Sequence, residues 1–403
     1  MKGKKVIFLI SQTLDQRNYD RFGLQSWKKA EWKIEVWDMT PLLFPEVWNY
    51  NQSNGVVVFN DPINIIIKST NDIPVVEKVD GISLFVDLIN NTEPLYLKIK
   101  SAFFDAGWSC LFLKLASLPE PKINLITKLK ELFFIQFAKI KNLKNYLIAK
   151  SKNIEFRRFS NRTYIAVSGY RTYQSALSLT IPNNIIKAHS FDYDQYISLK
   201  SKPLESGIGV FLDEDMPYHS DFIYNNISSI VSAERYFNSI NNFFSIIEEK
   251  KGIKFVIAAH PRSNYNGDRS WCYENFPVEK NNTAALIQKA SFVVAHSSAS
   301  IQLAVIYNKP ILLITTDEIE GSSYHRYIKE FSKELGCDII NVDKVRNLED
   351  IAIKSVNEEK YAKYEFSHVT MLEHHSEKLW DIIIGELQKK LESNLSVTIT
   401  SLK

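Results

Sequence analysis

Cysteine is scarce in this chain of 403 residues, which contains only Cys110, Cys272 and Cys337. The three lie far apart, and no two of them have the CxxC spacing of a metal or redox site. A reduced, cytosolic protein fits this pattern best. No group of metal-ligating residues has useful spacing either, so we expect no bound metal and no cofactor.

Long apolar runs are also missing, and none approaches the roughly 18 to 20 residues of a membrane-spanning helix. The chain begins with basic residues and an apolar run, but the run ends at Ser11 and Gln12, which is too short for a signal peptide. We therefore expect a protein that is not integral to a membrane. The net charge of +3 is too small to indicate nucleic acid as a partner.

Apolar runs typical of buried strands alternate with helical patterns along the chain, which has no internal repeat. In the first half the predicted strands are 6–10, 33–39, 63–67, 83–88, 108–115, 164–168 and 185–188. In the second half they are 209–212, 254–259, 292–295 and 310–315, separated by predicted helices at 228–249, 284–289 and 301–307. The alternation predicts an α/β protein with parallel sheets that helices cover on both faces.

The polar segment 198–206 marks the predicted domain boundary. We expect two Rossmann-like, doubly wound domains at 1–204 and 205–370. The remainder, 371–403, contains a predicted helix at 376–391 that packs back across the domains, followed by a tail.

A long helical pattern at 122–152 is strongly basic in its second half. The basic residues there are Lys139, Lys141, Lys144, Lys150 and Lys152. A solvated helix face explains them most simply. The alternative is a patch that contacts an anionic membrane or a lipid-linked ligand.

Three polar clusters each follow directly on an apolar strand of the second half. They are Asp213-Glu214-Asp215, His260-Pro261-Arg262 and His296-Ser297-Ser298. Ligands of an open parallel sheet bind beyond the carboxyl ends of its strands, so the clusters predict a site at one edge of this sheet.

The serines of the third cluster point to phosphate. Ser297, Ser298 and Ser300 precede a predicted helix, whose free N–H groups and positive dipole end favour an anion. Capping of the helix by a single serine is the alternative. We include His296 in the same candidate binding site.

In the second cluster, Pro261 restricts the backbone so that it directs the imidazole of His260 away from the strand end. Arg262 adds a permanent positive charge suited to phosphate. His260 can neutralise a phosphate leaving group, or act as a general acid when protonated. A structural histidine at a strand end is the alternative.

The acidic triplet supplies the candidate base or nucleophile. A carboxylate there can take a proton from an acceptor hydroxyl, or attack the reacting carbon to form a covalent intermediate. The residues decide neither between these routes nor which of Asp213, Glu214 and Asp215 acts. An acidic surface turn and a metal site are the further alternatives.

As an ordered set, the acidic triplet, His260-Pro261 and His296-Ser297-Ser298 resemble the motifs of bacterial sialyltransferases and of the Kdo transferases of capsule and lipopolysaccharide assembly. The resemblance covers mainly 209–316. It implies a GT-B fold, with two Rossmann-like domains facing a cleft, and a CMP-activated sugar as donor. The triplet departs from the sialyltransferase motif, because Met216 follows Asp215 where that motif has glycine.

The resemblance implies that His260 contacts the CMP phosphate, that Ser297 and Ser298 hold it, and that Asp213 or a neighbour is the base or nucleophile. The implied function is transfer of Kdo or a related nonulosonic acid to a bacterial surface glycan, either lipopolysaccharide O-antigen or capsule. Its partners would be a nucleotide-sugar donor and a glycan or lipid-linked glycan acceptor. The expected location is cytoplasmic, at the inner face of the plasma membrane.

Arg17, Asp20 and Arg21 lie in a predicted polar loop after the first strand, where they would line the acceptor side of the cleft. An ordinary surface loop is an equal alternative. Two other functions stay open. His-Pro and Ser-Ser motifs also occur in polyol-phosphate transferases, which implies a glycerophosphotransferase using CDP-glycerol. The third candidate is a non-catalytic module that binds nucleotide or sugar in a glycan assembly complex.

Overall fold

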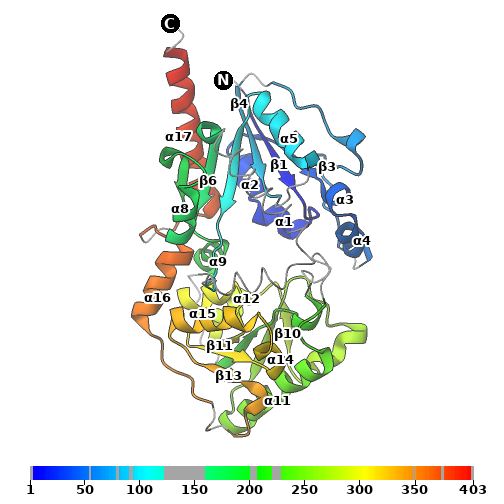
Figure 1. Cartoon of the computed structure of the whole chain (residues 1–403), viewed down its shortest axis with the longest axis vertical. Helices are drawn as coiled ribbons and strands as arrows, with labels where there is room; N and C mark the ends of the chain where they lie inside the picture. The colour runs from blue at the N-terminus through cyan, green and yellow to red at the C-terminus, as the bar shows by residue number, and fades with distance from the viewer. Residues whose placement is uncertain are drawn as a thin grey trace, which may run out of the picture. The chain divides into compact units, whose positions relative to one another are not determined.

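A computed structural model of the chain describes residues 3–53, 56–78, 81–89, 94–121, 159–199, 207–219, 228–347, 349, 351–373 and 376–400 (Figure 1). The side chains of 394–400 are not described. The chain divides into two compact units. Unit 1 comprises Met1–Leu115, Ile123–His189 and Leu372–Lys403, and unit 2 comprises Ala116–Lys122 and Ser190–Met371. The predicted domain boundary at 204–205 and the predicted basic helix at 139–152 both lie outside the described residues.

Unit 1 is built on a parallel sheet of seven strands in the order β3-β2-β1-β4-β5-β6-β7. The strands are β1 (Gly3–Ile10), β2 (Lys33–Asp38), β3 (Asn64–Ile66), β4 (Gly81–Asp87), β5 (Ser109–Lys114), β6 (Thr163–Val167) and β7 (Ile185–Lys187). The α-helices are α1 (Gln16–Arg21), α2 (Leu24–Lys29), α3 (Thr40–Leu43), α4 (Pro45–Ser53), α5 (Pro94–Asp105), α8 (Tyr170–Ala176) and α17 (Leu379–Thr400). Every strand predicted in this half of the sequence is confirmed.

Helix α17 completes the core of unit 1, although it is far along the chain from the sheet. The indole of Trp380 packs edge-on against Phe8 of β1 and tilted against Trp27 of α2, and its Nε1 donates to the carbonyl of Arg21 at 2.8 Å. Gly23 has a φ of 63°, and a Cβ there would lie 2.1 Å from a ring atom of Trp380. Both conditions require glycine at this position.

Unit 2 contains a parallel sheet of six strands in the order β10-β9-β8-β11-β12-β13. The strands are β8 (Ile208–Leu212), β9 (Phe255–Ala259), β10 (Val278–Lys280), β11 (Ala290–Ala295), β12 (Ile311–Thr315) and β13 (Ile339–Asn341). The α-helices are α9 (Phe191–Leu199), α11 (Ala233–Lys251), α12 (Thr283–Lys289), α13 (Ile301–Ile306), α14 (Asp317–Glu320), α15 (His325–Leu335) and α16 (Glu358–Tyr364). The 3-10 helices η4 (Met216–Tyr218), η5 (Gly267–Tyr273) and η6 (Val342–Lys344) follow strands β8, β9 and β13.

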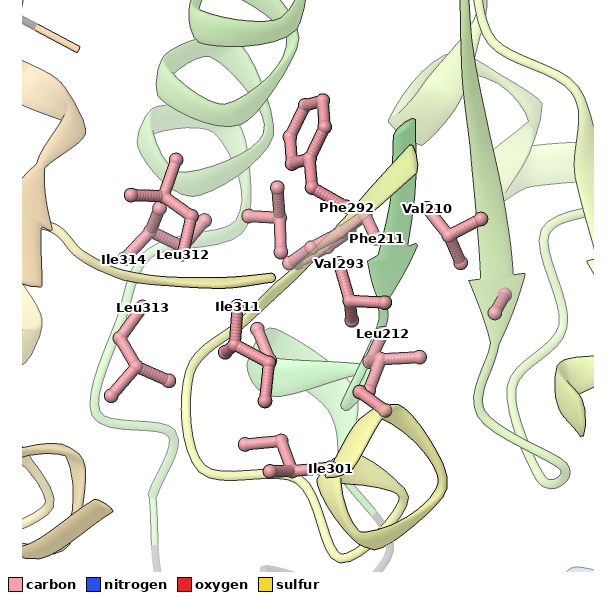
Figure 2. Close-up of a cluster of buried hydrophobic side chains, with 14 of the residues drawn as sticks. Val210, Phe211, Leu212, Phe292, Val293, Ile301, Ile311, Leu312, Leu313 and Ile314 are labelled. Atoms are coloured by element: carbon pink, nitrogen blue, oxygen red, sulfur yellow. The ribbon is translucent and has the colours of Figure 1, made fainter. Parts of the chain in front are cut away.

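The central strands of unit 2 form its core because they are apolar on both faces. Figure 2 shows side chains of β8, β11 and β12 packed together, with Ile301 of α13 beside them. Phe211, Val293 and Leu313 are fully buried. This rigid centre fixes the ends of the strands, where the polar clusters begin.

Both sheets share the doubly wound strand order in which the chain starts in the middle and later crosses to the other side. The direction reverses between β1 and β4 in unit 1 and between β8 and β11 in unit 2. The predicted fold class, two Rossmann-like α/β domains, is therefore confirmed. Strands β10 and β13, both at the edges of their sheet, were not predicted.

One local prediction is wrong. Arg17, Asp20 and Arg21 lie on helix α1 and not in a loop, because Asp15 caps the helix by accepting the backbone N–H of Asn18 at 2.7 Å. Among the described residues, no helix is long and apolar enough to cross a membrane.

Candidate functional site

The three polar clusters meet at the carboxyl edge of the unit 2 sheet, at the switch point between β8 and β11. The backbone N–H of His260 donates to the carboxylate of Asp213 at 3.2 Å. The backbone N–H of Ser297 donates to the carboxylate of Glu214 at 2.9 Å. The acidic residues after β8 thus hold the loops after β9 and β11 on either side of them.

Asp213 is the buried centre of this arrangement, with 4% of its surface exposed. Besides His260, it accepts hydrogen bonds from the hydroxyls of Tyr265 at 2.6 Å and Tyr273 at 3.0 Å, and from the N–H of Asp215 at 2.9 Å. Burial raises its pKa, and these donors oppose the rise. So many protein donors around a buried carboxylate indicate a positioning role.

Asp215 has left-handed backbone geometry with φ at 48°, a conformation that costs energy for a residue with a side chain. This turn begins η4 and keeps the Asp215 carboxylate buried next to that of Asp213. Burial, and then the charge of Asp213, raise the pKa of Asp215 to about 7, while the nearby Arg269 acts in the opposite direction.

Glu214 is half-buried and is bound by two groups of other loops. One is the Ser297 N–H, and the other is the hydroxyl of Tyr324, which donates to the Glu214 carboxylate. The Tyr324 oxygen in turn accepts a hydrogen bond from the hydroxyl of Ser297 at 2.5 Å. Burial raises the pKa of Glu214 to about 7 despite these donors. Near neutral pH the group can therefore gain or lose a proton.

His296 has a different environment from the one its sequence position indicated. The ring is fully buried, with Nε2 2.9 Å from the hydroxyl of Tyr236 and Nδ1 2.8 Å from the carbonyl oxygen of Ile314. Burial lowers its pKa to about 4, so the ring is neutral at physiological pH. Both ring nitrogens contact buried protein groups, so His296 holds the end of β11 in place and does not face a ligand at the edge.

His260 and Arg262 lie half-buried at the edge itself. The backbone N–H of Arg262 donates to Nδ1 of His260 at 3.3 Å, and the Ser263 hydroxyl donates to the His260 carbonyl at 2.8 Å. These contacts within the loop, together with the bond to Asp213, fix the backbone that carries the imidazole.

Ser298 and Ser300 are half-buried in the turn before α13. The N–H of Ser300 donates to the Ser298 hydroxyl at 3.3 Å. Ser300 occupies the cap position of α13, but its side chain makes no capping hydrogen bond. The Ser300 hydroxyl therefore does not cap α13, whereas the Ser298 hydroxyl binds the N–H of Ser300 at the start of the helix.

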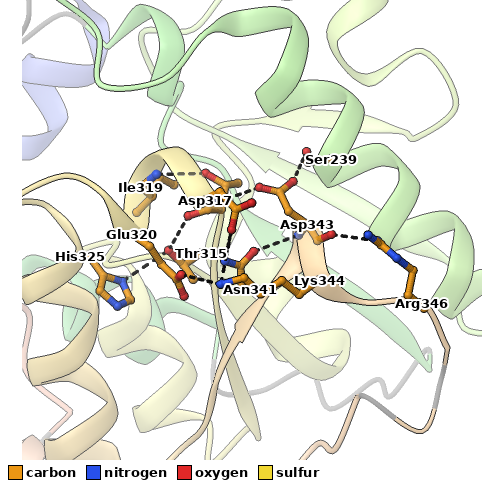
Figure 3. A network of polar contacts seen from close by, with 11 residues as sticks. Ser239, Thr315, Asp317, Ile319, Glu320, His325, Asn341, Asp343, Lys344 and Arg346 are labelled. Atoms are coloured by element: carbon orange, nitrogen blue, oxygen red, sulfur yellow. Dashed lines mark hydrogen bonds and ion pairs between the residues drawn. The ribbon is translucent and has the colours of Figure 1, made fainter.

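The other half of the same edge, after β12 and β13, carries a polar network that the sequence analysis did not identify (Figure 3). Asp343 accepts the backbone N–H of Asp317 at 2.7 Å, and the amide of Asn341 donates to the Asp317 carboxylate at 2.8 Å. Lys344 pairs with Glu320 at 2.9 Å. The Asn341 amide and Lys344 hold the pKa values of Asp317 and Glu320 below their usual range.

The tyrosines around the acidic triplet were also missed. Tyr265 and Tyr273 come from the loop and 3-10 helix after β9, Tyr236 from α11, and Tyr324 from the start of α15. They share no fixed spacing with the residues that they contact. In the described part of the chain, no group of three or more His, Cys, Asp or Glu residues is arranged to hold a metal.

The three predicted acceptor-side residues belong to unit 1. Arg17, Asp20 and Arg21 are exposed on α1, where Gln16 donates to Asp20 at 3.0 Å.

Comparison with known proteins identifies the fold. No protein-family model matches the chain, and no curated protein matches it. Among solved structures, the H444N variant of the wall teichoic acid polymerase TagF soaked with CDPG matches at 14% identity and a TM-score of 0.52, covering 98% of this chain and 90% of TagF. TagF itself matches at 13% identity and 0.51, covering 97% and 90%. A glycotransferase of kitacinnamycin matches at 10% and 0.48, covering 97% and 100%. The likeness to TagF concerns the fold, which is of the GT-B type.

Proposed function

We propose that this protein is a glycosyltransferase that moves Kdo or a related nonulosonic acid from a CMP-sugar onto a bacterial surface glycan. One observation carries the proposal: hydrogen bonds from His260 and Ser297 to the acidic triplet join three chemically distinct clusters at the switch point of the sheet. A switch point is where open α/β sheets bind nucleotides. The proposed location is cytoplasmic, at the inner face of the plasma membrane.

The donor phosphate is assigned to the space beside His260, Arg262 and Ser298. The guanidinium supplies positive charge, and the serine hydroxyl supplies a hydrogen bond. Because Nδ1 of His260 accepts the N–H of Arg262, the imidazole carries its proton on Nε2, which donates a second hydrogen bond to the phosphate. As the bond between sugar and phosphate breaks, negative charge grows on the phosphate oxygens. Groups already fixed in position stabilise that charge without reorganising.

The Glu214 carboxylate accepts the hydrogen bond from the Ser297 N–H, so a phosphate bound at Ser297 would compete with Glu214 for this donor. An ionised Glu214 repels phosphate, whereas a neutral one can give up this N–H without charge repulsion. With its pKa near 7, Glu214 links donor binding to a proton. We therefore assign it a role in admitting the donor, and retain Glu214 and Asp215 as the two candidates for the base or nucleophile. Asp213 positions the loops.

Glycerophosphate transfer from CDP-glycerol is the second candidate, and the likeness to TagF, one of whose structures was soaked with CDPG, favours it. The same phosphate-binding residues would serve both reactions. The difference lies in the bond that breaks: attack occurs at the sugar carbon in the first case and at phosphorus in the second.

Donor turnover separates the candidates. The protein is incubated with CMP-Kdo, CMP-sialic acid or CDP-glycerol, and release of CMP is measured for each donor. Release from a CMP-sugar alone supports the first proposal, and release from CDP-glycerol alone supports the second. Binding of CMP with no turnover of any donor indicates a non-catalytic module. The control is Asp317→Asn, on the opposite half of the edge, which should leave the choice of donor unchanged.

A set of three variants tests the acidic triplet itself. Asp213→Asn, Glu214→Gln and Asp215→Asn preserve size while removing charge. At least one of the last two should lower turnover about a hundredfold, the usual scale of a lost acid or base. If all three variants turn over like the wild type, the triplet has no part in the chemistry.

A further inference from the structure

An exposed apolar segment with basic neighbours lies on unit 1, whereas the acidic triplet belongs to unit 2. The described residues expose nine large hydrophobic side chains, and three of them fall within one short segment. They are Tyr170, Leu177 and Ile181, exposed by 43%, 38% and 42%. We call these three the α8 patch, because they lie on helix α8 and the turn that follows it.

Helix geometry places the first two members of the patch on one face. Leu177 ends α8 with helical dihedral angles, and its N–H donates to the carbonyl of Tyr173 at 3.2 Å. Residues seven apart in a helix lie above one another, so Tyr170 and Leu177 face the same side. The ring of Tyr173 stacks 6.4 Å from that of Tyr170 and extends this surface.

Basic side chains lie on and against the segment that carries the α8 patch, and the sequence from 159 to 191 contains no acidic residue. Lys187 lies over the ring of Tyr173, with Nζ 5.6 Å from its centroid. Arg171 is exposed on α8, and Lys390 of α17 reaches the same segment by donating to the carbonyl of Asn183 at 2.7 Å. Aromatic and aliphatic side chains among Lys and Arg match the chemistry of an anionic bilayer surface.

We propose that the α8 patch is a docking surface for an anionic lipid bilayer. Tyr170, Leu177 and Ile181 enter the interfacial layer, while Arg171 and Lys187 remain at the level of the lipid headgroups. The proposal does not depend on the proposed transfer activity. It is also distinct from the prediction for the basic segment 139–152, which concerns other residues.

Vesicle binding by the full chain tests the patch. We expect co-sedimentation with vesicles containing about one-third phosphatidylglycerol and little with phosphatidylcholine alone, because each basic residue near an anionic surface contributes about fivefold in affinity. Tyr170→Ser, Leu177→Ser and Ile181→Ser together should weaken binding at least tenfold. The matched control is Val57→Ser with Val75→Ser, which removes the even more exposed Val57 and Val75 of the same unit, at 80% and 83%.

A local probe keeps the test independent of protein folding. The three native cysteines are buried, so one introduced cysteine can be labelled selectively. Ser178→Cys places an environment-sensitive dye beside Leu177, and Ser53→Cys places it on α4; both are exposed serines whose hydroxyls donate to a nearby backbone carbonyl. With anionic vesicles, the dye at 178 should shift to the blue and the dye at 53 should not.

Several results would overturn the proposal. One is co-sedimentation without a shift at 178, which assigns binding to another part of the chain. Others are equal shifts at both positions, wild-type binding by the triple serine variant, and equal binding to neutral vesicles. Self-association that the triple variant abolishes, with no vesicle binding, would make the patch an interface between copies of this chain.

Discussion

Both units bury carboxylates at the ends of strands, but the charge of Asp87 in unit 1 and that of the acidic triplet in unit 2 are compensated in different ways. In unit 1, Asp87 at the end of β4 pairs with Lys100 of α5 at 2.9 Å, and both side chains are almost fully buried. In unit 2, Asp213, Glu214 and Asp215 form no ion pair with any described residue. Tyrosine hydroxyls and backbone N–H groups bind them instead.

The difference sets Asp87, which is neutralised by a cation, apart from the acidic triplet, which is not. The lack of a cation is not confined to unit 2, because the buried Asp38 of β2 is likewise bound by N–H groups of Thr40 and Leu14 and has a raised pKa. A buried ion pair is costly to break, so Asp87 and Lys100 hold α5 against the sheet. Carboxylates without a cation keep raised pKa values and respond to an incoming charge or proton. The proton occupancy of the edge of unit 2 therefore responds to pH near neutrality.

Breaking the ion pair of unit 1 should have the largest effect. Lys100→Met leaves Asp87 buried without its cation, which should lower the free energy of unfolding by about 3 to 5 kcal/mol in urea titrations. Adding Asp87→Asn should restore part of that loss, because no unpaired charge then remains. A loss below about 1 kcal/mol for Lys100→Met would show that the pair does not stabilise unit 1.

In unit 2, removing a single side chain should affect turnover more than stability. His260→Ala should lower the rate of nucleotide release about a hundredfold by slowing departure of the phosphate. The backbone bond to Asp213 is retained in this variant, so thermal unfolding should change little. Unchanged turnover would reject the role of His260, and a large loss of stability would make it a structural residue.

The pH dependence of stability should reflect the uncompensated acids of unit 2. In the folded state the pKa values of Glu214 and Asp215 are both about 7, well above the usual values of 4.5 and 3.8. Between about pH 4 and pH 7 the folded protein binds more protons than the unfolded chain. The free energy of unfolding therefore falls as pH rises toward 7 and is constant at higher pH. Between pH 6 and pH 8 the loss should be about 2 kcal/mol in denaturant titrations.

Charge-neutral variants isolate this contribution. Glu214→Gln and Asp215→Asn together should flatten the profile. Asp317→Asn should not, because the hydrogen bond from Asn341 and the charge of Lys344 hold the pKa of Asp317 below its usual value, far from this pH range. A wild-type profile that rises from pH 6 to pH 8 would contradict the raised pKa values.

The smallest effect should come from the tyrosine that bridges Glu214 and Ser297. Tyr324→Phe should lower donor turnover about tenfold by removing one hydrogen bond to a charged group. Since this donor lowers the pKa of Glu214, its loss should also move the Glu214 titration to higher pH. Tyr327→Phe is the control, because Tyr327 lies close by, with ring centroids 6.2 Å apart, but is 42% exposed. Equal effects of the two variants would remove any specific role of Tyr324.

The sequence predicted the central strands well, because strands covered on both faces must be continuously apolar. Strands β10 (VEK) and β13 (IIN) have three residues each, and β10 contains only one apolar residue. Strands β3 and β7 are equally short edge strands, but they were found because they lie in the longer apolar runs 63–67 and 185–188. Helix α1 was missed because its sequence, QRNYDR, is polar, and only the cap at Asp15 marks where it begins.

The candidate site was partly predictable for a related reason. Parallel strands end at the same edge, so His260 and Ser297 had to lie near the acidic triplet. The contact between Tyr324 and Glu214 joins residues 110 positions apart, a separation at which sequence gives no geometric signal. The buried orientation of His296 could not be predicted from the sequence either, because a residue at a strand end can face either side of the sheet.

The placement of Trp380 bears on the order in which the protein folds. Unit 2 beyond its first few residues is one continuous stretch, so its sheet can form while synthesis of the chain is still under way. Unit 1 cannot complete its core until 372–403 has been made, although its β1 is made early. The pocket around Phe8, Trp27 and Gly23 stays unfilled until α17 has left the ribosome.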